Sequence, residues 1–98
     1  MKFEWDSNKD LINIKKHGVS FEEAIYVFSD VDAISLFDTE HSNTEDRWIT
    51  IGKNKKSGLI TVIHTERFKN NEEYIRIISA RKAEESEEFE YIKRIGVK

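Results

Sequence analysis

The hydrophobic pattern of the chain changes period near residue 32, and this change limits the folds that the sequence can form. Before it, apolar residues recur at the three-to-four-residue spacing of helices. After it, they alternate every second residue, as in strands that bury one face. Helices followed by strands predict an α+β fold. A chain of 98 residues suits one domain, so we expect residues 1–98 to form a single unit.

Two short helices are predicted in the first third of the chain. A strand over Phe3–Trp5 precedes the first helix, which starts near Asp6 or Ser7 and ends at Gly18, a residue type favoured at helix C-termini. The second helix starts at the S-x-x-E capping box in SFEE. Its apolar residues form one stripe, which consists of Phe21, Ala24, Ile25 and Phe28.

Segments of alternating apolar residues follow, and their short links predict antiparallel hairpins. The predicted strands are Ala33–Asp38, Glu45–Gly52, Leu59–Glu66 and Tyr74–Ala80. A last helix over Ala83–Ile95 carries glutamates near its start and basic residues near its end, as the helix dipole favours. We therefore expect one antiparallel sheet, with the first two helices packed across one face and the last helix against an edge.

The alternation within the strands predicts two faces if each hairpin closes symmetrically on its loop. The face expected under the helices carries Ile49, Ile51, Ile60, Val62, Ile75 and Ile77, with Arg47, His64 and Glu45 at its end. Replacing Arg47 is therefore expected to affect stability more than activity. The opposite face mixes cations, hydroxyls and rings: Trp48, Thr50, Thr61, Ile63, Thr65, Arg67, Tyr74, Arg76 and Ile78. That mixture suits an RNA strand, although a one-residue slip would exchange the faces.

Basic residues concentrate in the second half of a chain whose formal net charge is −3. Residues 47–82 hold nine basic and three acidic residues. This segregation lets one surface attract phosphates, although two ordinary solvated surfaces would give the same counts. The chain has no cysteine, no signal-peptide pattern at its start and no apolar run long enough to span a bilayer. We expect a cytoplasmic protein that does not associate with a membrane.

Four sequence blocks in fixed order carry a resemblance to a known family. They are FEWD with Lys9 and Asn13, KKHGVSFEEA at 15–24, EDRWITIG at 45–52, and HTER with RIISARKA at 64–67 and 76–83. Together they resemble the BrnT-type toxins over most of the chain. The resemblance implies a RelE-like fold and a metal-independent endoribonuclease toxin that inhibits translation. It also implies a BrnA-type ribbon-helix-helix antitoxin, with operator DNA contacted only through that antitoxin.

RNA cleavage without a metal uses the 2′-hydroxyl as nucleophile, so the protein has to supply a base, cations and an acid. His64 and Glu45 are the predicted proton-transfer residues, and His41 is a third candidate. Glu45 is also expected to pair with an arginine, which would make it a poor acid because the pKa of a paired carboxyl falls. The arginines expected to hold phosphate, each of which could instead form a surface salt bridge, are Arg67, Arg76 and Arg81.

Further residues are expected to bind RNA: Lys16, His17, Lys53, Lys55, Lys56 and Trp48. The first two could equally favour the C-terminal end of a helix, whereas the three hairpin lysines are expected to converge with Arg67 and Arg76 around one phosphate. The histidines lack the local spacing of metal ligands, so no metal site or cofactor is predicted. The sequence also fits a second class of function. In this alternative, the chain is a binding domain without catalysis that holds RNA or a protein on the basic sheet.

Overall fold

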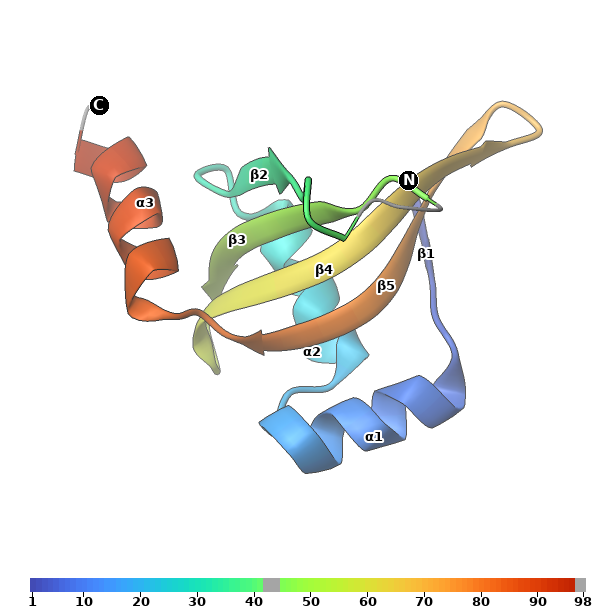
Figure 1. The fold of residues 1–98 in the computed structure, drawn as a ribbon, viewed down its shortest axis with the longest axis horizontal. Helices are drawn as coiled ribbons and strands as arrows, with labels where there is room; N and C mark the ends of the chain where they lie inside the picture. Colours follow the sequence, from blue (N-terminus) through green and yellow to red (C-terminus); the bar gives the residue numbers. More distant parts are fainter. Residues whose placement is uncertain (42–44, 97–98) are drawn as a thin grey trace.

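The computed structural model describes residues 1–41 and 45–96, which form a five-stranded sheet with helices at its faces (Figure 1). The strand order across the sheet is β1-β5-β4-β3-β2. The elements are β1 (Lys2–Glu4), α1 (Ser7–His17), α2 (Phe21–Ile25), the 3-10 helix η1 (Tyr26–Ser29), β2 (Ile34–Phe37), β3 (Trp48–Asn54), β4 (Gly58–Lys69), β5 (Glu72–Lys82) and α3 (Glu85–Gly96).

The sheet is mixed rather than purely antiparallel. Strands β2 to β5 form the predicted antiparallel meander, but β1 pairs in parallel with β5, with Phe3 opposite Ile75. The expectation of an all-antiparallel sheet is therefore wrong at this edge. Helices α1, α2 and η1 separate β1 from the meander, so no hairpin fixes the direction in which β1 runs.

Local capping explains both ends of α1 and the start of α2. Asp6 accepts hydrogen bonds from the backbone N–H groups of Asn8 and Lys9, and Gly18 ends α1 in the left-handed conformation. Ser20 and Glu23 form the predicted capping box at the start of α2. The sequence therefore encodes these boundaries locally, and the structure confirms them.

The main core lies between the sheet and the N-terminal helices. In Figure 1, α2 lies behind the strands and α1 below them. Asn13 of α1 is buried, and it both donates to and accepts from the backbone of Ala80, which fixes α1 on β5. The buried residues of this core are Val19, Phe21, Ala24, Val27, Ile60, Val62, Ile75, Ile77 and Ala80.

Strand β3 is shifted by one residue relative to the predicted register. Thr50 pairs with Val62 and Gly52 with Ile60, so Thr50 and Gly52 share the helix-covered face. Ile49 and Ile51, which were expected there, lie on the opposite face. The covered face needs a glycine because a Cβ at Gly52 would lie 2.6 Å from Cγ1 of Val27. The predictions for Ile60, Val62, Ile75 and Ile77 are confirmed.

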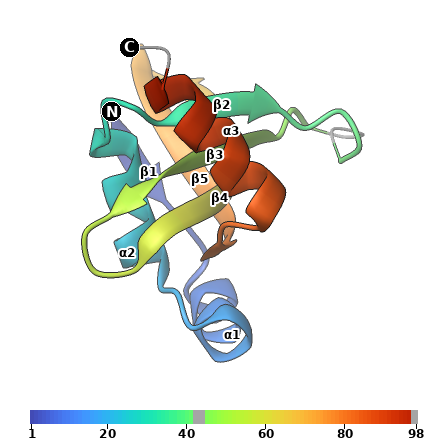
Figure 2. The ribbon, with the colours of Figure 1, turned by 90° about the vertical axis from the view of Figure 1, so that its left-hand side faces the viewer.

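The face opposite α1 and α2, called the open face below, is partly covered by α3 at one end. Figure 2 shows α3 crossing in front of the sheet. This helix packs against β3, an internal strand, rather than against the edge strand that was expected. Its Tyr91 is buried and donates a 2.6 Å hydrogen bond to Asp30. The rest of the open face remains available for a ligand.

Candidate nucleic-acid interface

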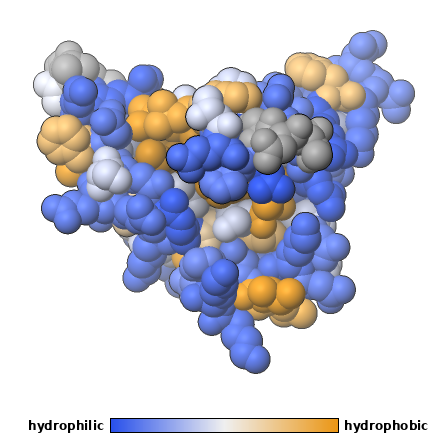
Figure 3. Space-filling model, in the orientation of Figure 1, coloured by the Kyte–Doolittle hydropathy of each residue, from blue (hydrophilic) through white to orange (hydrophobic). Residues whose placement is uncertain are grey.

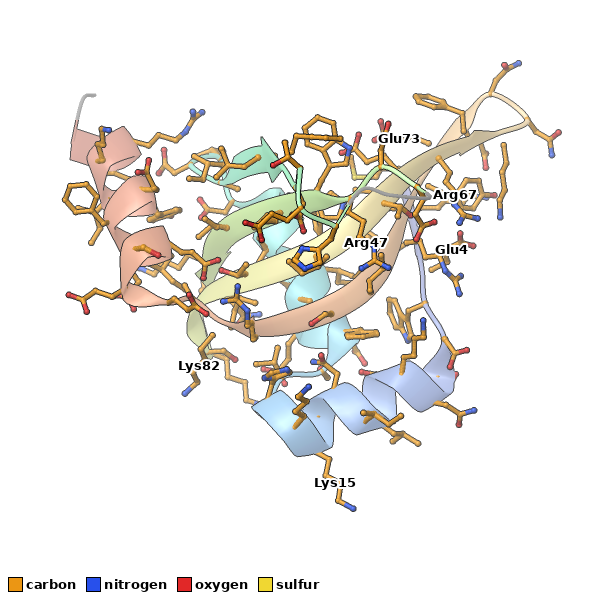
Figure 4. The ribbon with its side chains drawn as sticks, viewed as in Figure 1. Glu4, Lys15, Arg47, Arg67, Glu73 and Lys82 are labelled. Carbon is orange, nitrogen blue, oxygen red and sulfur yellow. The ribbon has the colours of Figure 1, made fainter. Side chains whose placement is uncertain are left out.

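Arginine side chains from three segments gather on the open face. Arg76 of β5 pairs with Thr65 of β4, and Arg67 lies two residues further along β4, so both arginines project from the same side of the sheet. Arg47 precedes β3 and shares the side of Ile49. Figure 4 shows Arg47 and Arg67 on the side of the sheet that faces the viewer. We call Arg47, Arg67 and Arg76 the arginine row.

Two carboxylates pair with the arginine row. Glu45 lies 3.2 Å from Nη2 of Arg67 and 3.9 Å from Nε of Arg47, and Glu4 lies 4.0 Å from Nη1 of Arg76. The pairing of Glu45 with an arginine confirms that prediction. Ion pairs this exposed contribute little to stability, with a typical value of about 0–1 kcal/mol. An RNA phosphate can therefore replace Glu45 on Arg67 at small cost.

A histidine and an aspartate continue the row on the other side of Arg47. The backbone N–H of Asp38 donates to the carbonyl of Arg47 at 2.9 Å, which places the two residues opposite each other beyond the end of the β2–β3 pair. Nδ1 of His41 lies 3.0 Å from Oδ2 and 3.2 Å from Oδ1 of Asp38. The Asp38 side chain is 9% exposed, whereas that of His41 is 62% exposed. The buried carboxylate of Asp38 thus orients the accessible imidazole of His41.

The same face is hollowed between the arginine row and α3. The hollow has a volume of about 760 Å³, within the range of small-molecule sites. Ile49, Ile63 and Ile78 contribute apolar surface, and Arg47 and His41 contribute polar groups. Figure 3 shows that hydrophilic residues dominate this side of the molecule. Apolar surface beside cations is suited to a nucleotide, which has a planar base and a charged phosphate.

Arg81 has a different environment from the arginine row. Its guanidinium donates to both carboxylate oxygens of Glu87, at 2.6 and 2.9 Å. Glu87 also accepts a hydrogen bond from Thr61 and one from the backbone N–H of Glu84. Arg81, predicted as a catalytic residue, therefore joins β5 to the start of α3. Its guanidinium is occupied by this pairing and lies outside the proposed reaction centre.

His64 lies in the core rather than on an accessible surface. The residue is 0% exposed, its Nε2 is 2.6 Å from Oγ1 of Thr50, and its ring meets Phe28 edge-on. It was expected near the end of its strand, but β4 continues to Lys69, and His64 therefore lies mid-strand on the covered face. Burial lowers its pKa from 6.5 to about 4. RNA cannot reach this side chain in the folded protein, so the predicted catalytic role does not fit.

The buried histidine predicts that stability falls on mild acidification. Below pH 6.5, His64 is protonated in the unfolded chain, but in the folded chain it stays neutral down to about pH 4. The free energy of unfolding therefore decreases as the pH falls across this window. The expected loss is about 3 kcal/mol. Urea unfolding at a series of pH values measures it. The variant His64→Gln should show a flatter profile between pH 6.5 and 4.5, and an equally steep profile in this variant would contradict the prediction.

The hairpin lysines lie far from the arginine row. Lys55 and Lys56 occupy the turn between β3 and β4, and Arg67 lies at the other end of β4, roughly 30 Å away at 3.3 Å per residue. In Figure 4, Lys82, which pairs with the start of β4, lies at the opposite end of the sheet from Arg67. The expected convergence around one phosphate is therefore wrong. Lys53, Lys55 and Lys56 instead border a separate hollow of about 790 Å³ beside α2.

The other residues expected to bind RNA also lie off the open face. Trp48 pairs with His64, and the one-residue shift of β3 therefore places it on the helix side, where it meets Phe37 edge-on. Lys16 and His17 occupy the last turn of α1. Their position there fits the alternative reading that they favour the C-terminal end of that helix.

Within residues 1–41 and 45–96, no group of three or more histidine, aspartate or glutamate side chains is arranged to hold a metal ion. None of the helices in that part of the chain combines the length and apolar character needed to cross a membrane.

Comparison with known proteins connects this geometry to a family. A family model described as the ribonuclease toxin BrnT of a type II toxin-antitoxin system matches residues 5–87. The chain belongs to the BrnT family. A crystal structure of the Brucella abortus ribonuclease toxin BrnT resembles it with a TM-score of 0.62 and 26% identity, covering 87% of this chain and 99% of that chain. No functionally curated protein matches. As type II systems pair a toxin with an antitoxin, family membership implies an antitoxin partner and an RNA target.

Sequence reasoning missed two features of this BrnT chain's open face. Arg47 was noticed in the block EDRWITIG but assigned to the core-facing side, because the predicted register of β3 was one residue off. Asp38 was not singled out at all. The D-x-x-H spacing of Asp38 and His41, directly after a strand, was a signal that could have indicated the pair.

Proposed function

We propose that this chain is a metal-independent endoribonuclease toxin that cleaves RNA on the open face and so inhibits translation. The observation that carries the proposal is the arginine row, which presents three guanidinium groups on one accessible face beside a hollow of nucleotide size. BrnT family membership supports the activity, and the row supports its location.

The arginine row supplies the electrostatic part of the reaction. When the 2′-oxygen attacks phosphorus, negative charge builds on the non-bridging oxygens, and the bond from phosphorus to the 5′-oxygen breaks. Arginine offers a permanently charged, forked donor to such oxygens. A preorganised donor of this kind stabilises the transition state by roughly 3 kcal/mol. Glu45 and Glu4 hold the guanidinium groups in place until a phosphate displaces them.

The same cations support metal independence. A divalent metal in a nuclease neutralises charge on the phosphate, and the arginine row can perform that task with side chains alone.

The proposed partner is a dimeric ribbon-helix-helix antitoxin of BrnA type. The antitoxin would neutralise the toxin, and the complex would contact operator DNA only through the antitoxin. The first turn of α3 carries Glu85, Glu87 and Glu88, so this helix would repel a DNA backbone rather than bind it. Because the substrate is RNA used in translation, we propose that the protein acts in the cytoplasm.

Cleavage of a short RNA by the purified chain in excess chelator tests the proposal. We expect products with a 2′,3′-cyclic phosphate and a 5′-hydroxyl, and no cleavage of the same RNA methylated at every 2′-oxygen. Activity that appears only after a divalent metal is added would contradict metal independence. Binding without cleavage would favour the second candidate, a binding domain that uses the basic face without catalysis.

A further inference from the structure

We infer that His41, oriented by Asp38 at the end of the arginine row, is the general base that removes the proton from the 2′-hydroxyl. The inference rests on the proposed function and assigns a role within the same site. It concerns a residue in the segment that joins β2 to β3, outside the regular elements.

The contacts of His41 determine which ring nitrogen can act. Both carboxylate oxygens of Asp38 lie within 3.2 Å of Nδ1. An ionised carboxylate only accepts hydrogen bonds, so Nδ1 carries the hydrogen and donates it. In the neutral ring, Nε2 then presents a lone pair, as required of a general base.

The position of Asp38 brings this base to the cationic site. Its backbone N–H is bonded to the carbonyl of Arg47, which makes Asp38 and Arg47 cross-strand neighbours. Side chains directly opposite each other in an antiparallel pair have Cβ atoms about 5 Å apart. His41 also borders the hollow and is well exposed. A phosphate on Arg47 would therefore lie close to Nε2.

The other candidate bases are less suitable. His64 is enclosed in the core, and His17 lies at the end of α1. Glu45 is already engaged in ion pairs with Arg67 at 3.2 Å and with Arg47 at 3.9 Å, so its carboxylate oxygens are occupied. Of the three histidines in the chain, His41 is the one that borders the open face.

Nε2 of His41 takes the proton of the 2′-hydroxyl as the 2′-oxygen forms its bond to phosphorus. The bond between phosphorus and the 5′-oxygen breaks, and the leaving oxygen takes a proton from water. Asp38 stabilises the imidazolium that forms, which later returns its proton to solvent.

The test is RNA cleavage by His41→Ala in excess chelator, with and without added imidazole. The expected rate is lower by about 100-fold, the low end of the range for a positioned base. Imidazole should restore part of the rate in a concentration-dependent way, because it can occupy the vacated space and accept the proton. It should not restore Arg76→Ala, which lacks a cation rather than a base. Lys15→Ala, which removes an exposed side chain on α1 away from the open face, should cleave like the wild type.

Asp38→Asn tests the positioning role. The amide can donate a hydrogen bond to Nδ1 and thereby move the ring hydrogen to Nε2, so we expect a lower rate although a side chain of the same size remains. Because the two residues act as a unit, the double variant His41→Ala/Asp38→Asn should be no slower than His41→Ala alone.

The outcomes separate the inference from the proposed function. If the wild type cleaves RNA and folded His41→Ala cleaves equally well, or is slow without any rescue by imidazole, the base assignment is overturned while the proposed function stands. If the wild type does not cleave RNA, both are overturned.

Discussion

Arg47→Ala is expected to lower the rate of RNA cleavage by about 10²–10³-fold, because one preorganised charge donor to the scissile phosphate is lost. The side chain lies on the open face beside Asp38 and is bridged to Arg67 through Glu45. It is not part of the main core. The melting temperature should therefore fall by less than about 8 °C, which corresponds to roughly 1 kcal/mol in a domain of this size. Initial rates on a short RNA and a thermal melt measure both quantities.

Two comparisons make this prediction specific. Arg67→Ala and Arg76→Ala should cause losses of similar size, because the three arginines share one face. Lys82→Ala removes an exposed cation at the opposite end of the sheet and should cleave like the wild type (Figure 4). A folded Arg47→Ala protein with wild-type activity would contradict the arginine row.

Phe21→Ala is expected to lower the free energy of unfolding by about 3–5 kcal/mol, the usual cost of removing a fully buried aromatic ring. Phe21 is 0% exposed and meets Trp5 edge-on at 6.2 Å between ring centroids. Its backbone N–H also donates to Asp10, so the surrounding chain cannot easily collapse into the cavity. Small domains have total stabilities of about 5–15 kcal/mol, and the variant should therefore be close to unfolding at physiological temperature.

Phe89→Ala is the matched control for this change. Phe89 lies on α3 and is 65% exposed, so the same truncation there should change the free energy of unfolding by no more than about 0.5 kcal/mol. Urea unfolding of both variants measures the difference. Equal losses at the two positions would mean that the core between the sheet and the N-terminal helices has been placed wrongly.

The elements of the fold could be predicted from the sequence wherever local chemistry specifies them. Asp6, Gly18 and the capping box of Ser20 and Glu23 determine helix ends through contacts within a few residues. The direction of β1 could not be predicted in this way, because its partner β5 lies some 70 residues away along the chain. The register of β3 depends on the close approach of Val27 to Gly52, a contact between distant segments.

The same limits explain which parts of the site were predicted. Arg67 and Arg76 were assigned to the RNA-binding face, and the structure places them together on the open face. The one-residue shift of β3 exchanged Arg47 and Trp48 between the faces. The lysine hairpin was grouped with the arginines because of its charge, but strand length, rather than charge, sets the distance between them.

Backbone amide chemical shifts recorded with a short 2′-O-methylated RNA, which can bind but cannot be cleaved, test most directly where the substrate lies. The proposed site predicts the largest changes at Arg47, Arg67, Arg76 and His41, with small changes at Lys55 and Lys56. The largest changes at the lysine hairpin or along α1, with the open face unaffected, would contradict the assignment of RNA cleavage to the open face.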